Sequence, residues 1–220
     1  MDASTRPTAA ARRAQLVVAI FVGTALALRL GLTIFDPGPG QDPDLFVRLE
    51  RFVSYFTIQS NFAIFVMAIA VLRAPDLGTP WMRAMRLASL FGITVTSIVY
   101  VIVLAGDADN SGLAQLANLM LHYVGPPLSV GLWIVYGPWP PIAVSDIPRA
   151  MIWPGLWIAY TLIHGAITDW YPYPFIDVAA NGYATVAVNI VAVTAFALAL
   201  SLAYVGVNRH RRAKQHSRSV

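Results

Sequence analysis

NGYATVAVNIVAVTAFALALSLAYVGV, residues 181–207, contains no charged side chain and few polar ones. A helix of about 20 apolar residues is long enough to cross the hydrocarbon core of a bilayer. Five other stretches have the same character, and hydrophobic residues make up 57% of the chain. The six predicted spans are Gln15–Phe35, Ser54–Leu72, Arg86–Leu104, Leu113–Tyr136, Met151–Thr168 and Asn181–Val207. We predict an all-α polytopic membrane protein with six transmembrane helices in one domain, 1–207, followed by a basic, disordered tail, 208–220.

The distribution of basic residues predicts the orientation. Twelve of the 15 Lys and Arg residues lie in the tails and in the loops on the same side, whereas only Arg48 and Arg51 lie in the loops on the other side. Because cytoplasmic loops contain the positive excess, both termini are expected in the cytoplasm. The absence of cysteine excludes disulfides and thiolate sites. A cysteine-free, Ala- and Arg-rich chain fits a bacterial inner membrane, and topology accounts for the basic pI without nucleic-acid binding.

Polar residues within the spans gather in one half of the membrane, the outer half in this orientation. Positions three or four apart share a helix face. On that basis we expect one polar cavity, open to the outer side. The residues assigned to it are Arg29, Ser54, Thr57, Asn61, Asn118, His122, His164 and Asn189. Ser, Thr and Asn also bridge packed membrane helices without any chemistry, so the titratable members are the more informative ones.

His122 is the strongest candidate for chemistry. Pro126 has no N–H to bond the carbonyl of His122, and its ring crowds that carbonyl, so the helix should kink there. A histidine that meets a hydroxyl can remove its proton during attack on a carbonyl carbon. Ser54 and Thr57 lie at a compatible depth. Arg29 either extends to the headgroups or binds an anionic group of an amphiphile.

Three segments occur together: RFVSYFTIQSN at 51–61, NLMLH at 118–122 and WYPYPFID at 170–177. This combination resembles the androgen-induced, ADTRP-like family of membrane hydrolases and its bacterial six-helix relatives. The resemblance implies a hydrolase of fatty acid esters of hydroxy fatty acids. It places the nucleophile at Ser54, an Asn and the catalytic His at Asn118 and His122, and a Tyr-Pro-Phe step at Tyr173.

The chain departs from that pattern in two ways. A serine stands where the family has its nucleophilic threonine, and TIQSN, which contains Thr57 and Asn61, is a feature of the bacterial branch. Thr57 therefore stays a rival nucleophile, one turn deeper. Ser54, Thr57 and His122 are the predicted catalytic residues. The predicted substrate-binding residues are Arg29, Asn61, Asn118, His164, Tyr173 and Asn189.

Other function classes were weighed against the hydrolase. A transporter is disfavoured, because no Asp or Glu lies within the predicted spans and the inner halves of several helices are wholly apolar. A zinc enzyme needs about three protein ligands, but only two histidines lie at depth, so no metal or other cofactor is expected. A non-enzymatic lipid-binding or receptor-like protein is the main alternative. The expected partners are a lipid or fatty acyl ester and the bilayer, and the oligomeric state stays open.

Overall fold

The computed structural model describes residues 7–36, 38, 41–73, 77–107, 111–137 and 141–216. These residues form helices and connecting loops, with no strand in any of the described ranges. Six helical segments are long and apolar enough to cross a membrane, which confirms that part of the prediction. Their bounds are Ala9–Phe35, Phe56–Arg73, Pro80–Leu104, Gly112–Tyr136, Val144–Thr168 and Val178–Lys214.

Three of the spans lie within a single helix, and the other three contain a change of helix type. The helices are α1 (Ala9–Phe35), α2 (Leu45–Ser54), α3 (Phe56–Arg73), α4 (Pro80–Val99), α5 (Gly112–Asn118), α6 (Gly125–Tyr136), α7 (Ile147–Ala150), α8 (Ile152–Thr168) and α9 (Val178–His216). π-Helical turns, η2 (Tyr100–Leu104) and η4 (Leu119–Val124), follow α4 and α5, and short 3₁₀ turns are η3 (Ala105–Asp107), η5 (Val144–Asp146) and η6 (Pro174–Ile176).

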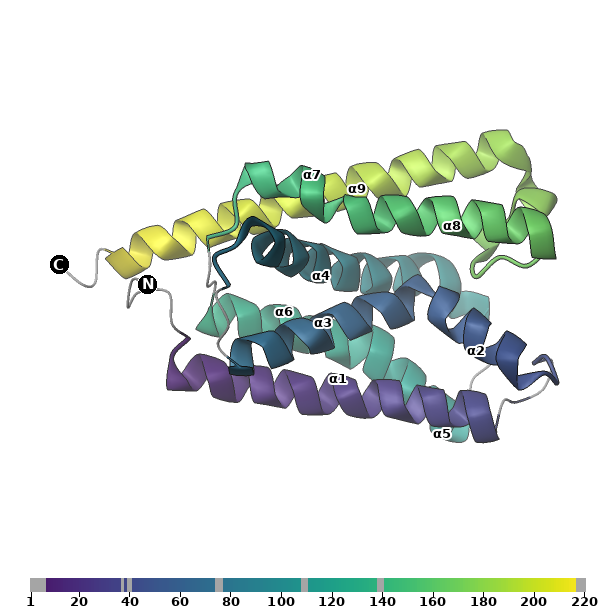
Figure 1. Ribbon diagram of the computed structural model, residues 1–220, viewed down its shortest axis with the longest axis horizontal. Coiled ribbons are helices and arrows are strands. Elements are labelled where there is room, and N and C mark those ends of the chain that lie inside the picture. The colour runs from purple at the N-terminus through teal and green to yellow at the C-terminus, as the bar shows by residue number, and fades with distance from the viewer. Residues whose placement is uncertain are drawn as a thin grey trace.

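The helices pack around α4. It contacts α3, α6, α7 and α9, and it contains the fully buried Leu87, Phe91 and Ile93. α1 packs along α3 and α6 on one flank, and α8 and α9 run side by side on the opposite flank (Figure 1). α1 begins and α9 ends at the same end of the bundle. We call the opposite end, where α1 ends at Phe35 and α8 ends at Thr168, the distal end.

Several predicted boundaries differ from those of the structure, and three of the differences matter for the site or the termini. The second span begins at Phe56 rather than Ser54, because Tyr55 has an extended backbone (φ −67°, ψ 125°) that separates α3 from the amphipathic α2. The fifth span begins at Val144, so it includes Asp146, which is buried. α9 continues through the basic segment to His216, where we predicted a disordered tail. Arg211 fixes this extension to α6, since its Nη1 donates to the carbonyl of Val135 at 3.0 Å.

Candidate active site

A cavity of about 340 Å³ lies at the distal end of the bundle. Its walls come from α1, α2, α3, α5, the two π-helical turns and the segment 170–174. Five of the residues predicted for a functional site line it, namely Arg29, Thr57, Asn118, His122 and Tyr173. We refer to it as the distal cavity. The residues come from four separate parts of the chain, so only the packing of the helices brings them together.

Thr57 and His122 meet on the wall of this cavity. The Thr57 Oγ1 lies 3.3 Å from the His122 Nε2, and the His122 Nδ1 lies 3.2 Å from the backbone carbonyl of Asn118. A proton on Nδ1 would be donated to that carbonyl, which leaves Nε2 as the acceptor for the threonine hydroxyl. This is the relation of nucleophile, base and orienting group found in acyl-transfer sites. The orienting group here is a backbone carbonyl, not the Asn118 side chain.

A π-helical turn positions His122. The predicted kink before Pro126 takes this form: η4 contains His122, and α6 begins at Gly125. The Pro126 ring nitrogen cannot bond the His122 carbonyl, which accepts instead from the Ser97 Oγ at 2.7 Å. The imidazole also stacks on Tyr100 of η2, with ring centroids 3.9 Å apart. Two π-helical turns therefore face each other at the histidine, and such turns are frequent at functional sites.

Tyr173 completes the contacts of Thr57. Its hydroxyl accepts from the Thr57 backbone N–H at 3.1 Å and lies 3.2 Å from the Thr57 Oγ1. That N–H belongs to the first turn of α3, where backbone donors have no partner within the helix. Burial of the phenol raises the pKa of Tyr173 to about 12, so it is protonated at neutral pH. Asp177, matched in the same sequence segment, accepts from the Ala180 N–H at the start of α9 instead and does not line the cavity.

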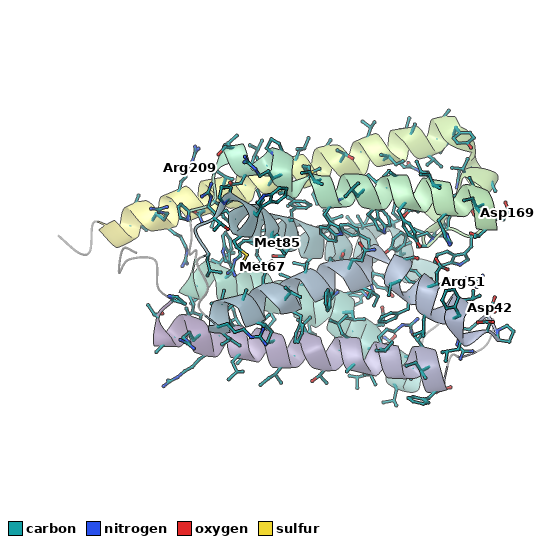
Figure 2. All side chains as sticks on the ribbon, viewed as in Figure 1. Asp42, Arg51, Met67, Met85, Asp169 and Arg209 are labelled. Atoms are coloured by element: carbon teal, nitrogen blue, oxygen red, sulfur yellow. The ribbon has the colours of Figure 1, made fainter. Side chains whose placement is uncertain are left out.

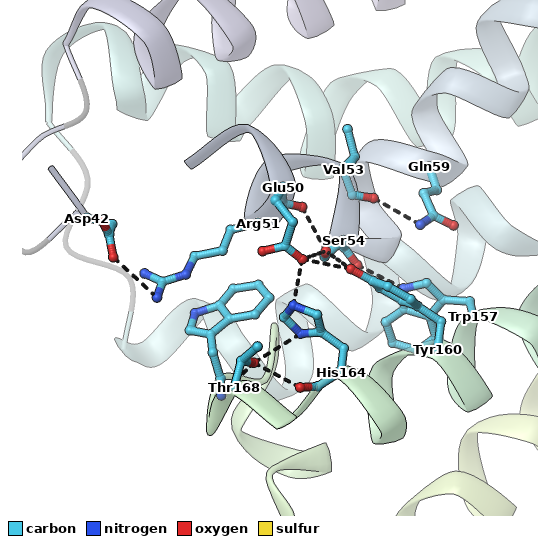
Figure 3. A network of polar contacts seen from close by, with 11 residues as sticks. Asp42, Glu50, Arg51, Val53, Ser54, Gln59, Trp157, Tyr160, His164 and Thr168 are labelled. Carbon is cyan, nitrogen blue, oxygen red and sulfur yellow. Dashed lines mark hydrogen bonds and ion pairs between the residues drawn. The ribbon is translucent and has the colours of Figure 1, made fainter. Parts of the chain in front are cut away.

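Ser54 does not lie with His122, contrary to the prediction that both face one cavity. Its Oγ donates to the Glu50 carbonyl at 2.7 Å and lies 2.6 Å from the Tyr160 hydroxyl (Figure 3). The residue is 1% exposed and does not line the distal cavity. Spacing i, i+3 would place Ser54 and Thr57 on one face of an unbroken helix, but the extended backbone of Tyr55 lies between them.

His164 belongs to the same group of side chains as Ser54. Its Nε2 lies 2.7 Å from the Glu50 Oε1, which also accepts from the Tyr160 hydroxyl at 2.8 Å. Figure 3 shows this group, which we call the Glu50 cluster, joining α2 to α8. Sequence reasoning missed Glu50, because it was assigned to an outer loop. The sequence did contain a signal for it: Glu50 and Ser54 are four residues apart in the amphipathic segment 45–54, so they lie on one face of a helix.

Asn61 and Asn189 bond to the backbone of the elements around the distal cavity and do not face the cavity itself. Asn61 is fully buried, and its Nδ2 donates to the carbonyl of Thr57 at 2.9 Å and to that of Leu121 at 3.4 Å. Asn189 donates to the carbonyl of Phe175 at 2.8 Å. Neither residue lines the distal cavity. Their amides join α3 to η4 and α9 to η6, so their contacts are those of bridging residues.

Arginines give the distal cavity a positive wall. Arg48 and Arg51 line it together with Arg29. Arg48 is bonded to the backbone carbonyls of Thr33, Ile34, Asp42 and Pro43. Arg51 lies 3.6 Å from Asp42. Arg29 makes no hydrogen bond or ion pair through its guanidinium in the part of the chain that the structure describes, so its donors are available to a ligand.

A second cavity of about 260 Å³ adjoins the first. It lies between α3, α4, α8 and α9 and is lined mainly by apolar side chains such as Phe91, Trp157 and Val193. Thr57, Tyr100, Leu104 and Tyr173 line both cavities. We refer to this one as the apolar cavity. Thr57 thus lies where a polar, cationic space meets an apolar one.

Comparisons with family models, with curated proteins and with solved structures found no match for this chain. Within the described residues, no three His, Asp or Glu side chains converge on a point where a metal ion could bind. The geometry of the two cavities and of the residues between them is therefore the basis for inferring a function.

Proposed function

We propose that the protein is a membrane-embedded lipid ester hydrolase, with Thr57 as the nucleophile and His122 as the general base. The observation that supports it most directly is the 3.3 Å contact between the Thr57 Oγ1 and the His122 Nε2 on the wall of the distal cavity. The distance is slightly longer than a tight hydrogen bond, as is common for catalytic contacts without a substrate. Thr57 replaces Ser54 as the favoured nucleophile because Ser54 bonds to Glu50 and Tyr160 instead.

The reaction has two halves. The hydroxyl proton of Thr57 passes to the His122 Nε2 while the Thr57 Oγ1 bonds to the ester carbonyl carbon. The bond from that carbon to the alcohol oxygen then breaks, and the alcohol takes the proton from His122. Water repeats the sequence on the acylated Thr57 and releases the fatty acid.

Negative charge develops on the carbonyl oxygen during each attack. Thr57 is the second residue of α3, so this charge forms beside the positive end of a helix. The hydroxyl of Tyr173 lies within 3.2 Å of the Thr57 Oγ1 and is a further donor. Preorganised donors of this kind stabilise an oxyanion because they need no rearrangement during the reaction.

The two cavities favour an amphiphile with an anionic group on one side of its ester. The guanidinium of Arg29 would bind a carboxylate or phosphate in the distal cavity, and the apolar cavity would hold an acyl chain. The ester would then lie at Thr57, between them. A fatty acid ester of a hydroxy fatty acid, the substrate class implied by the sequence resemblance to the ADTRP-like hydrolases, has this form.

We also propose that both termini are cytoplasmic, that the membrane is a bacterial inner membrane, and that the distal end faces outward. Figure 2 places Arg209 toward the end where the chain begins and ends, and Asp42 and Asp169 at the distal end. The basic excess near the termini supports this orientation. A substrate would enter from the outer leaflet. A periplasm-only reporter fused after Val220 should give no signal.

A non-enzymatic lipid-binding function is the second candidate. The observation that favours it is Arg29, whose guanidinium faces the distal cavity without a protein partner among the described residues. A binding protein for anionic lipids needs this feature but has no need of the contact between Thr57 and His122.

Labelling of the purified protein with a fluorophosphonate probe, together with turnover of a long-chain fluorogenic ester, separates the two functions. A hydrolase should be labelled and should turn over the ester, and His122→Ala should abolish both while the protein still folds. General-base help is worth about 10²–10⁴-fold in rate, so the loss should be large. An unlabelled parent protein that hydrolyses no long-chain ester, but binds anionic lipid, would establish the binding function instead.

A further inference from the structure

A small cavity lies further along the bundle from Thr57, in the half nearer the termini. Its volume is about 10 Å³, and its walls come from α1, α3, α4 and α6. The polar side chains that line it are Gln15, Arg86, Ser89, Ser129 and Trp133. None of them takes part in the proposed hydrolysis. We call this space the Arg86 cavity.

Arg86 is buried without a counter-charge. The residue is 4% exposed, and no described residue is a hydrogen-bond partner of its Nε. None of the described residues that line the cavity is a carboxylate. Asp146, the buried carboxylate at this end of the bundle, is bonded to Arg83 instead, through its Nε at 3.0 Å and its Nη2 at 3.1 Å. A guanidinium at this depth is costly unless an anion or a set of acceptors compensates it.

A second donor faces the same space. Trp133 is 1% exposed, and among the residues that the structure describes its indole Nε1 has no acceptor. Ser89 and Ser129 use their hydroxyl protons on the backbone carbonyls of Arg86 and Gly125, at 2.9 and 2.7 Å. The buried side-chain atoms at the cavity that lack a partner are therefore two N–H donors, and one of them belongs to a cation.

We propose that the Arg86 cavity binds a single halide ion, chloride under cellular conditions, held by Arg86 and Trp133. A space of this size admits one small particle, so a phosphate or a lipid carboxylate is too large. Water would satisfy a donor, but it would not neutralise the guanidinium. A monoatomic anion does both. Because the ion would contact side chains of α4 and α6 beside α1, it would stabilise the packing of these helices.

Thermal unfolding of the purified full-length protein in detergent tests this proposal. Sodium chloride is compared with sodium gluconate at the same ionic strength, because gluconate is too large for the cavity. An ion that binds only the folded state shifts the unfolding equilibrium about tenfold for each tenfold rise in its concentration above Kd. Chloride should therefore raise the melting temperature progressively, and gluconate should not.

Three variants localise the effect. Arg86→Met and Trp133→Phe should remove or weaken the dependence on chloride, whereas Arg149→Met, at an exposed arginine on the same end of the bundle, should retain it. If Arg86→Met does not fold, Trp133→Phe and the parent protein still decide the question. An equal response of the parent to chloride and gluconate would overturn the proposal, as would full retention of the chloride effect in both Arg86→Met and Trp133→Phe.

Crystals of the parent protein grown in sodium bromide give a direct measurement. An anomalous bromide peak between Arg86 and Trp133 would support the site. Density there without an anomalous signal would identify a water molecule and overturn the proposal. Both experiments are independent of the hydrolase, because neither uses turnover and no residue of the Arg86 cavity lines the distal cavity.

Discussion

Thr57→Val and Ser54→Ala form a matched pair that separates the two candidate nucleophiles. Valine has nearly the shape of threonine, so Thr57→Val removes the hydroxyl and leaves the packing. It deletes the contacts of the Oγ1 with His122 at 3.3 Å and with Tyr173 at 3.2 Å. Ser54→Ala deletes the contacts of the Oγ with the Glu50 carbonyl at 2.7 Å, with the Glu50 Oε1 at 3.2 Å and with the Tyr160 hydroxyl at 2.6 Å. The two changes therefore remove two and three hydrogen bonds, respectively, from buried positions.

The cost in stability should therefore be similar. A neutral hydrogen bond contributes about 0.5–1.5 kcal/mol net, and a buried group left without its partner costs about 1–3 kcal/mol. In Thr57→Val, the Tyr173 hydroxyl still accepts a hydrogen bond from the backbone N–H of residue 57, at 3.1 Å. In Ser54→Ala, the Tyr160 hydroxyl still donates to the Glu50 Oε1, at 2.8 Å. Each variant should thus lose on the order of 1 kcal/mol in free energy of unfolding.

The two variants should differ strongly in activity. Thr57→Val has neither the nucleophile nor the proton that His122 removes, so turnover should fall by at least the roughly 10²–10⁴-fold attributed to general-base help. Ser54→Ala should retain most of its kcat/KM, because Ser54 is outside both cavities. Kinetics on a long-chain ester and intact-protein mass spectrometry of the acyl adduct measure this. An acyl adduct on Thr57→Val, or loss of the adduct in Ser54→Ala alone, would refute the assignment of Thr57 as the nucleophile.

Arg29→Leu should weaken binding of an anionic ester far more than that of a neutral ester of equal length, measured as a ratio of KM values, and equal effects would exclude an anion-binding role. Asp146→Asn should destabilise the protein by about 3 kcal/mol in a denaturant titration, and Arg83→Gln by more, because Asp146 is fully buried whereas Arg83 is 22% exposed. The opposite order would contradict this account of the ion pair. Tyr173 has a folded-state pKa of about 12 against an ordinary value of 10, so between these pH values the unfolded state loses the phenolic proton first. Stability should therefore fall by about 1.4 kcal/mol per pH unit in that window and stay constant below it, and Tyr173→Phe should remove this part of the slope.

The sequence predicted the number of spans and the half of the protein that contains the polar cavity. Both follow from local composition: a run of about 20 apolar residues has few stable alternatives to a helix in a bilayer. It also predicted that His122 lines this cavity and that Pro126 distorts the helix there, since a missing N–H acts on the carbonyl four residues earlier whatever the surroundings. The type of distortion was less predictable, because a π-helical turn depends on partners such as Ser97.

The sequence was less reliable about which polar residues share the cavity. Helical periodicity assigned Ser54 and Thr57 to one face, but the extended backbone at Tyr55 separates them. It assigned His164 to the cavity as well, although the carboxylate of Glu50 holds that side chain beside α2. The contacts of Glu50 with Ser54 and His164 were not predicted, because a carboxylate near a predicted membrane boundary is usually assigned to a loop. Tyr100 and Arg51 were missed because nothing local distinguishes an aromatic or basic side chain that lines a cavity from one at the membrane interface.

The sequence by itself determined that this chain forms six apolar helices, because the cost of exposing backbone N–H and C=O groups to lipid leaves no other outcome. Only the tertiary structure decided which hydroxyl meets His122, which arginine of the distal cavity has no partner among the described residues, and which donors surround the Arg86 cavity. Those relations depend on distances of a few ångströms between helices far apart in the chain, such as α3 and η4. Periodicity fixes the face of one helix, but the helix that covers that face is selected by packing with the rest of the bundle.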